Sequence, residues 1–151
     1  AYRQLTALVA PGAIFYGLDL TGARLQGAHL EDADLRNCKL TCADLRGANL
    51  KNAKLTNADL RDANLGPLLI TGDKLLKAHL DRADARYCDF RGTDLRQAVF
   101  TDTDTAFADL RGAALRATDF RGAILSGVKF SIDATIEAIF DESRYAAVAN
   151  G

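Results

Sequence analysis

The sequence repeats every five residues without interruption from residue 20 to residue 130. Positions divisible by five form one column across this span, and 20 of its 23 members are Leu or Phe. The column two residues earlier is small, with Ala at 14 of its 23 positions. A typical unit is Ala43-Asp44-Leu45-Arg46-Gly47, with polar residues between the two apolar columns. A repeat that keeps its phase over this length predicts one continuous repetitive architecture.

A five-residue period fits neither regular secondary structure. On an α-helix, steps of five residues rotate by about 140°, so the Leu column would spiral around the surface. On a straight strand, steps of five alternate between the two faces. The column can face a single core only if the chain turns a corner once in every repeat. The pattern therefore predicts a β-solenoid whose coils pair through their backbones.

The recurring Ala-(Asp/Asn)-Leu unit resembles the pentapeptide-repeat family over about residues 13–130. The resemblance implies an all-β fold, the right-handed quadrilateral β-helix. Four repeats then make one coil, residues twenty apart stack, and the span forms about six coils with a rise of roughly 4.8 Å each.

Open solenoid ends are adhesive edges, so we expect caps. Residues 2–10 carry Leu5, Leu8 and Val9 at helical spacing before a Pro-Gly pair, which predicts an N-terminal helical cap over residues 1–12. Residues 131–151 are expected to form a C-terminal capping helix. The family resemblance makes that helix a possible homodimer surface.

Residues 66–76 are the clearest irregularity in the repeat. Leu68 occupies a small-residue position, Leu69 and Leu76 fall at outward positions, and Pro67 removes a backbone donor. This segment is either a structural bulge or an apolar patch for a partner. Leu68, Leu69 and Leu76 are therefore the candidate partner-contact residues.

The sequence predicts no catalytic, cofactor-binding or metal site. His29 and His79 are ten repeats apart, which in a twenty-residue coil puts them on opposite faces. The same spacing separates Cys38 from Cys88, and Cys42 lacks the second ligand pair that zinc requires. Carboxylates on the outward columns are accompanied by arginines, which favours a solvated surface of mixed charge.

The formal net charge is −1, from 19 basic and 20 acidic residues, so we expect no direct binding of nucleic acid. No apolar stretch is long enough for a membrane span. The sequence favours a non-enzymatic scaffold that binds an unidentified protein partner. The family resemblance offers an alternative, a DNA mimic that binds a type II topoisomerase (gyrase), which the near-zero net charge disfavours.

Three cysteines without disulfide spacing favour a reducing, cytoplasmic compartment. The first residue is Ala1, so the alternative is an exported or organelle-lumenal protein whose targeting segment has been removed.

Overall fold

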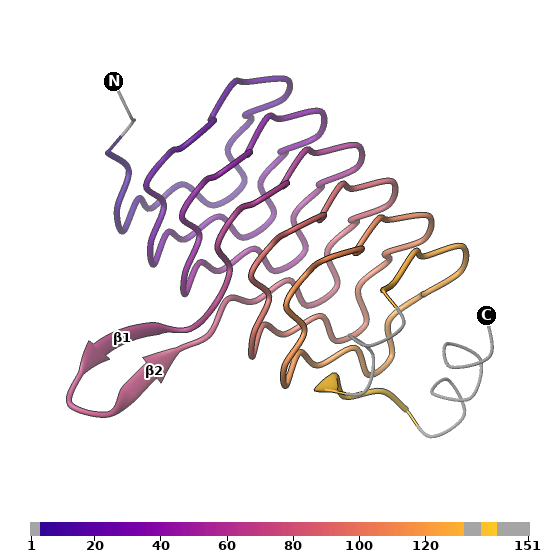
Figure 1. The fold of residues 1–151 in the computed structure, drawn as a ribbon. Helices are drawn as coiled ribbons and strands as arrows, with labels where there is room; N and C mark the ends of the chain where they lie inside the picture. The colour runs from indigo at the N-terminus through magenta and orange to yellow at the C-terminus, as the bar shows by residue number, and fades with distance from the viewer. Residues whose placement is uncertain (1–3, 132–136, 142–151) are drawn as a thin grey trace.

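The computed structural model describes residues 4–131 and 137–141. The chain winds as a β-solenoid, and Figure 1 shows its coils stacked along one axis with a single hairpin projecting from the side. Each repeat makes one side and one corner of a coil. In a representative repeat, Leu45 points inward, Arg46 and Gly47 form the corner, Ala48 points inward, and Asn49 faces solvent. We call these the large, corner, small and face positions.

The corner of each repeat is a tight turn that one hydrogen bond closes. At the representative corner, the Ala48 N–H donates to the Leu45 carbonyl at 3.0 Å. The second corner residue has positive φ, +66° at Gly47. A type II turn requires positive φ at this point, which favours Gly and Asn. The sequence supplies mainly Gly, Asn and Asp at these positions, so it specifies where the chain turns.

Face residues of successive coils pair in parallel and build four faces. Face 1 contains Gln4, Arg24, Asp44, Asn64, Asp94 and Ala114. Face 2 contains Val9, His29, Asn49, His79, Val99, Asp119 and Ile139. Face 3 contains Ile14, Asp34, Lys54, Asp84, Asp104 and Ile124. Face 4 contains Asp19, Lys39, Asp59, Asp89, Asp109 and Lys129. Four residues of one coil therefore define a four-sided cross-section.

Large and small residues alternate around the inside of each coil and fill the core. Leu45 and Ala48 are fully buried, as are most of their equivalents. Where Ala85 and Thr105 replace large residues, phenylalanines contribute volume nearby. Phe90 and Phe100 meet edge to face, with ring centroids 5.7 Å apart. Aromatic rings from neighbouring repeats can thus occupy volume that the smaller side chains leave in the core.

The irregular segment forms an antiparallel hairpin outside the solenoid. Strand β1 spans Leu68–Thr71 and β2 spans Lys74–Leu76. Coils stack at an interval of twenty residues on either side of the hairpin, but Asn49 pairs with His79 at an interval of thirty. The hairpin therefore inserts ten residues into one corner. Because ten is two repeats, the five-residue phase in the sequence does not reveal the insertion.

The predicted N-terminal helix is wrong where the structure describes it. Gln4 and Val9 bridge to Arg24 and His29, so residues 4–12 already belong to the first coil. The spacing of Leu5, Leu8 and Val9 suits a helix, but in the solenoid Leu5 takes a large position and Leu8 a small one. Residues 1–3 lie outside the described part.

The predicted C-terminal helix is also not supported. Ile139 bridges to Asp119, and the Ile139 N–H donates to the Thr118 carbonyl at 2.8 Å. Phe140 stacks on Phe120 with ring centroids 5.5 Å apart, so residues 137–141 add to the stack. Most of the expected helix, with the dimer surface assigned to it, lies outside the described residues.

Candidate functional site

The hairpin leaves the solenoid at the corner between faces 1 and 2. The Gly66 N–H donates to Asn64 Oδ1 at 3.0 Å. A Cβ at Gly66 would lie 3.0 Å from Asp94 Oδ2 and 3.1 Å from Asn64 Oδ1. These two neighbouring face residues leave little room for a side chain, so glycine suits the point where the chain departs. Pro67 follows at the root of the hairpin.

One side of the hairpin packs against the solenoid beneath it. Leu68 and Leu76 are partners in the β1–β2 register, and both are partly buried. A Cβ at Gly47 would lie 2.9 Å from Leu76 Cδ2 and 3.1 Å from Leu68 Cβ. A Cβ at Gly27, one coil earlier, would lie 3.9 Å from Leu68 Cδ2. Two stacked glycines thus form the seat of the hairpin.

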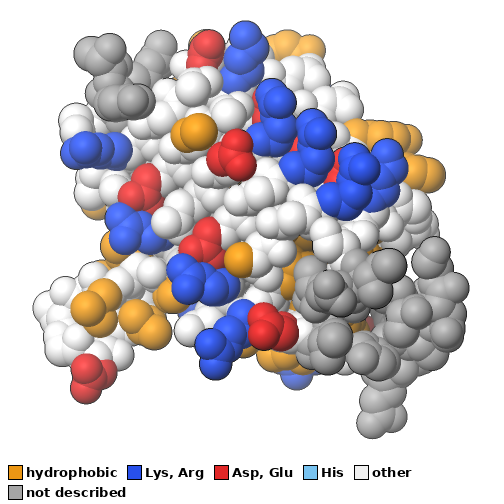
Figure 2. All heavy atoms as spheres, in the orientation of Figure 1, with side chains coloured by type: hydrophobic (Ala, Val, Ile, Leu, Met, Phe, Trp, Pro, Cys, Tyr) orange, Lys and Arg blue, Asp and Glu red, His pale blue; other side chains and the backbone are white. Residues whose placement is uncertain are grey.

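The other side of the hairpin is apolar and exposed. Leu69 pairs with Leu75 in the register, and their side chains are 62% and 44% exposed. Ile70 is 45% exposed. We call these three residues the hairpin patch; Figure 2 shows apolar side chains on the projecting hairpin. Ile70 and Leu75 belong to the five-residue Leu column, which predicts that both face the core. That prediction is wrong for these two residues, because both are exposed on the hairpin.

The candidate contact residues therefore divide into two groups. Leu69 lies in the exposed hairpin patch, whereas Leu68 and Leu76 anchor the hairpin to the solenoid. Sequence reasoning missed Ile70 and Leu75 because they keep the phase of the core column. The signal that points to them is the surrounding sequence: Pro67 at a corner position, and Leu68 and Asp73 at small positions, depart from the repeat.

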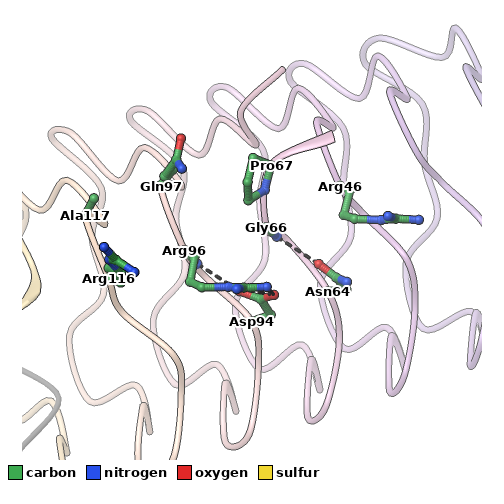
Figure 3. Close-up of a pocket in the computed structure, with 9 residues that line it drawn as sticks. All are labelled: Arg46, Asn64, Gly66, Pro67, Asp94, Arg96, Gln97, Arg116 and Ala117. Carbon is green, nitrogen blue, oxygen red and sulfur yellow. Dashed lines mark hydrogen bonds and ion pairs between the residues drawn. The ribbon is translucent and has the colours of Figure 1, made fainter. Parts of the chain in front are cut away.

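A basic hollow lies beside the root of the hairpin. It has a volume of about 580 Å³ and is lined by Arg46, Asn64, Gly66, Pro67, Asp94, Arg96, Gln97, Arg116 and Ala117. Figure 3 shows the three arginines spaced along the solenoid, with Gly66 and Pro67 in the interval between Arg46 and Arg96. Arg46 and Arg96 form ion pairs of 2.7 and 2.6 Å with Asp44 and Asp94. Arg116 makes no ion pair within the described part of the chain.

Most arginines on the solenoid are held by an aspartate two residues earlier. In the hollow, Arg96 Nη2 donates to Asp94 Oδ2 at 2.6 Å, and the Arg96 N–H donates to Oδ1. Burial acts to raise the pKa of Asp94, but these hydrogen bonds outweigh it and lower that pKa. The same side-chain pairing occurs at seven other places, at residues 34/36, 44/46, 59/61, 84/86, 89/91, 109/111 and 119/121. The acidic side chains are therefore neutralised locally.

The ten-residue insertion moves other sequence candidates. His29 and His79 both lie on face 2, so the prediction that they occupy opposite faces is wrong. Cys38 and Cys88 likewise fall on one side of the solenoid, and both are buried. Each thiol donates to a carbonyl of a preceding coil, at 2.9 Å for Cys38 and 2.8 Å for Cys88. They lie two coils apart, with Ala58 in the intervening coil.

The described residues hold no group of three or more His, Cys, Asp or Glu side chains placed to bind a metal ion. The same part of the chain has no helix with the length and apolar character needed to cross a membrane.

The model of the pentapeptide repeat family matches residues 13–52, 28–66, 74–102 and 105–131, with eight copies. The chain belongs to the pentapeptide repeat family. The matches leave out residues 67–73, which contain β1 and the turn of the hairpin, and residues 103 and 104. The pentapeptide repeats thus cover most of the solenoid, and the longest internal break falls in the hairpin.

Solved structures of pentapeptide repeat proteins are similar to this chain. HetL, from the cyanobacterium Nostoc sp. strain PCC 7120 and involved in heterocyst differentiation regulation, is 26% identical over 84% of this chain, with a TM-score of 0.39. This chain covers 62% of HetL, less than two thirds of its length. QnrB1, a plasmid-mediated fluoroquinolone resistance protein, is 15% identical over 99% of this chain and 91% of its own, with a TM-score of 0.40.

A pentapeptide repeat protein from the Arabidopsis thaliana thylakoid lumen is also similar. It is 23% identical over 76% of this chain and 69% of its own, with a TM-score of 0.32. No curated protein sequence matches the chain.

Proposed function

We propose that this chain is a non-enzymatic β-solenoid scaffold that binds a protein partner through its hairpin. The observation that carries the proposal is the asymmetry of the hairpin. Leu68 and Leu76 anchor one side on the solenoid, while Leu69, Ile70 and Leu75 stay exposed on a segment that contributes nothing to the coil stack. An exposed apolar cluster on a rigid support is typical of an interaction site.

The basic hollow supports a partner with acidic groups beside its apolar contact. Arg46, Arg96 and Arg116 line the solenoid next to the hairpin root, and Arg116 carries a charge that no described side chain neutralises by an ion pair. Interfaces commonly combine an apolar centre with a polar rim, and complementary charge sets orientation and association rate. We therefore expect association to weaken as salt rises.

A hairpin replacement tests the proposal. Residues 66–77 are exchanged for Arg-Gly, the dipeptide that already forms the corner at residues 46 and 47. The ladder partners on both sides of the corner remain, so we expect a folded solenoid that no longer captures the partner. Immobilised wild type and variant are compared in affinity capture from the native organism. Equal recovery of every bound protein by both would sink the proposal.

Point variants locate the contact more finely. Leu69→Ser with Leu75→Ser should abolish capture while leaving the anchoring leucines in place. Ile124→Ser removes an aliphatic side chain of similar exposure, 46%, from face 3 and serves as the matched control. Equal loss in both variants would indicate a general surface effect rather than the hairpin patch.

The DNA-mimic alternative is weakened by the local pairing of charge. A mimic must offer carboxylates in place of phosphates, but eight aspartates on the solenoid each bind an arginine two residues ahead. A gyrase supercoiling assay with the purified protein separates the two functions. Inhibition that survives the hairpin replacement would favour mimicry over hairpin-mediated binding.

A further inference from the structure

We propose that the corner between faces 3 and 4 binds an arginine side chain of a partner protein, at Asp104 and the stacked rings of Tyr87 and Phe107. This corner lies diagonally opposite the corner from which the hairpin projects. Further coils flank the surface on both sides, and it shares no residue with the hairpin.

The carboxylate of Asp104 lacks the partner that most face aspartates have. Eight face aspartates bind the side chain of an arginine two residues ahead. Residue 106 is alanine, so Asp104 has no such arginine. Its Oδ1 accepts the Ala106 N–H at 3.1 Å, and within the described residues it makes no side-chain hydrogen bond. The side chain is 33% exposed, so a guanidinium from outside can reach it.

The nearest arginine, Arg86, is already engaged one coil earlier. Its Nε and Nη2 donate to Asp84 at 2.8 and 2.7 Å. The same Nε lies 3.7 Å from Asp104 Oδ2, which is an ion pair but too long for a hydrogen bond. In the following coil, the equivalent face and corner residues are Ile124 and Ser126, and neither carries a charge. Two carboxylates therefore share one guanidinium, and Asp104 can accept a second.

Two aromatic residues occupy the adjacent corner in a backbone conformation that does not favour them. Tyr87 and Phe107 have positive φ, +59° and +61°, where the two preceding coils have Asn37 and Asn57. A bulky side chain is strained at positive φ, and such strain gathers at functional sites. The two rings stack with centroids 5.2 Å apart, and each residue is 54% exposed. The strained corner thus presents an aromatic ridge to solvent.

Arginine suits the carboxylate and the rings together. Its planar guanidinium binds a carboxylate through two parallel hydrogen bonds and also stacks on aromatic rings, while its methylene stem packs on apolar surface. The chain contains this combination elsewhere. Arg36 Nη2 lies 2.6 Å from Asp34 Oδ2, and its Cζ lies 5.5 Å from the centroid of the Tyr16 ring. At Asp104 the chain supplies the carboxylate and the rings, so the arginine comes from the partner.

A peptide titration followed by NMR tests the site. The probe is a tripeptide with one arginine between two glycines, blocked at both ends, and the amide shifts of Ala106 and Phe107 report its binding. We expect saturable shifts at both residues. Citrulline keeps the shape of arginine without its charge, and a citrulline peptide should bind at least about tenfold more weakly. Equal binding of the two peptides, or no shift at either residue, overturns the proposal.

Two variants separate this carboxylate from the rest of the charged surface. Asp104→Asn should weaken the arginine peptide at least about tenfold. Asp119→Asn is the matched control, because Arg121 already binds that carboxylate, and it should leave the affinity unchanged. Ala106→Arg supplies a guanidinium from within the chain, as at residues 84 and 86, and should abolish binding. Equal losses in the two asparagine variants, or full binding by Ala106→Arg, contradict the site.

Phe107→Asn tests the contribution of the rings. Asparagine occupies the same corner position at Asn37 and Asn57, so we expect this variant to fold. Loss of the ring should weaken the arginine peptide about two- to fivefold, with the Ala106 amide as the reporter. Unchanged affinity in the folded variant would show that the aromatic ridge takes no part in binding.

Discussion

His79 lies in the same stack of bridges as His29, two coils away, with Asn49 between them. Coil spacing of roughly 4.8 Å keeps the two backbones about 10 Å apart, and each ring has its own acidic neighbour. Nδ1 of His79 is 3.0 Å from Asp81 Oδ2, and Nδ1 of His29 is 3.4 Å from Glu31 Oε1. Each imidazole thus interacts with the carboxylate at its own corner and not with the other imidazole.

The seat of the hairpin is sensitive to a single added carbon. Gly47→Ala should lower the free energy of unfolding by about 1–2 kcal/mol, because alanine is strained at positive φ and its Cβ meets Leu76 and Leu68. Gly17→Ala is the matched control, since its φ is +68° and no atom lies within 4 Å of the added Cβ. Chemical denaturation of both variants measures the difference, and equal losses would contradict the packing contribution.

Leu75 and Leu80 belong to the same sequence column, but we expect them to contribute very differently to the free energy of unfolding. Leu80 is fully buried, so Leu80→Ala should cost about 2–5 kcal/mol in unfolding free energy. Leu75 is 44% exposed on the hairpin, and Leu75→Ala should cost less than about 1 kcal/mol. Urea denaturation compares the two. Similar costs would mean that Leu75 belongs to the core after all.

The three thiols should separate by accessibility. Cys42 is exposed, whereas Cys38 and Cys88 are buried. Burial raises the pKa of the Cys88 thiol and of the Cys38 thiol, and so disfavours the reactive thiolate. Ellman's reagent should modify Cys42 alone in the native protein and all three residues in denaturant. Rapid native reaction in the Cys42→Ser variant would contradict the burial.

Stability should fall in acid as the aspartate–arginine pairs lose their charge. The hydrogen bond from the Arg36 side chain is the largest influence on Asp34 and lowers its pKa from 3.8 to about 2. A carboxyl with a lower pKa in the folded state stabilises the fold above its unfolded pKa and loses that contribution as pH falls through the folded value. The stability difference between wild type and Asp34→Asn should be greatest above about pH 4 and shrink toward pH 2.

Denaturation at a series of pH values measures this difference. Arg36→Gln removes the other partner of the pair and should give the same pH profile. A difference that stays constant between pH 4 and pH 2 would rule out the pair as its source.

The sequence predicts the solenoid well because every repeat contains both the residues that fill the core and the residue that permits the turn. Leu45 and Ala48 fill the core, and Gly47 permits the turn, so the same five residues specify inside, outside and corner. The sequence does not predict the hairpin, because Ile70 and Leu75 keep the phase of the Leu column although neither enters the core. The sequence alone does not show whether these ten residues are two further repeats of the solenoid or a hairpin outside it. The bridge between Asn49 and His79 shows that they lie outside the stack.

The prediction of a helix at the N-terminal end is wrong for a different reason. Leu5 and Leu8 satisfy both a helical spacing and the inward positions of the solenoid, whereas Val9 suits only the helix and is exposed at a face position. The bridge between Val9 and His29 shows that the segment follows the solenoid, because it pairs its backbone with that of the next coil.

The sequence marks residues 66–76 as irregular, and the structure places a hairpin there. Which of the hairpin leucines face solvent depends on the packing of Leu68 and Leu76 against Gly27 and Gly47, which the sequence does not reveal.

The hairpin has a consequence for how such a protein can change. Its two ends meet at one corner, and the neighbouring rungs close around that corner as they do elsewhere. The length of the excursion therefore does not have to be a multiple of five, since nothing beyond the corner registers it. A loop of another length that leaves and re-enters the solenoid at this corner would not shift the coils that follow, so an insertion here is compatible with the repeat on both sides.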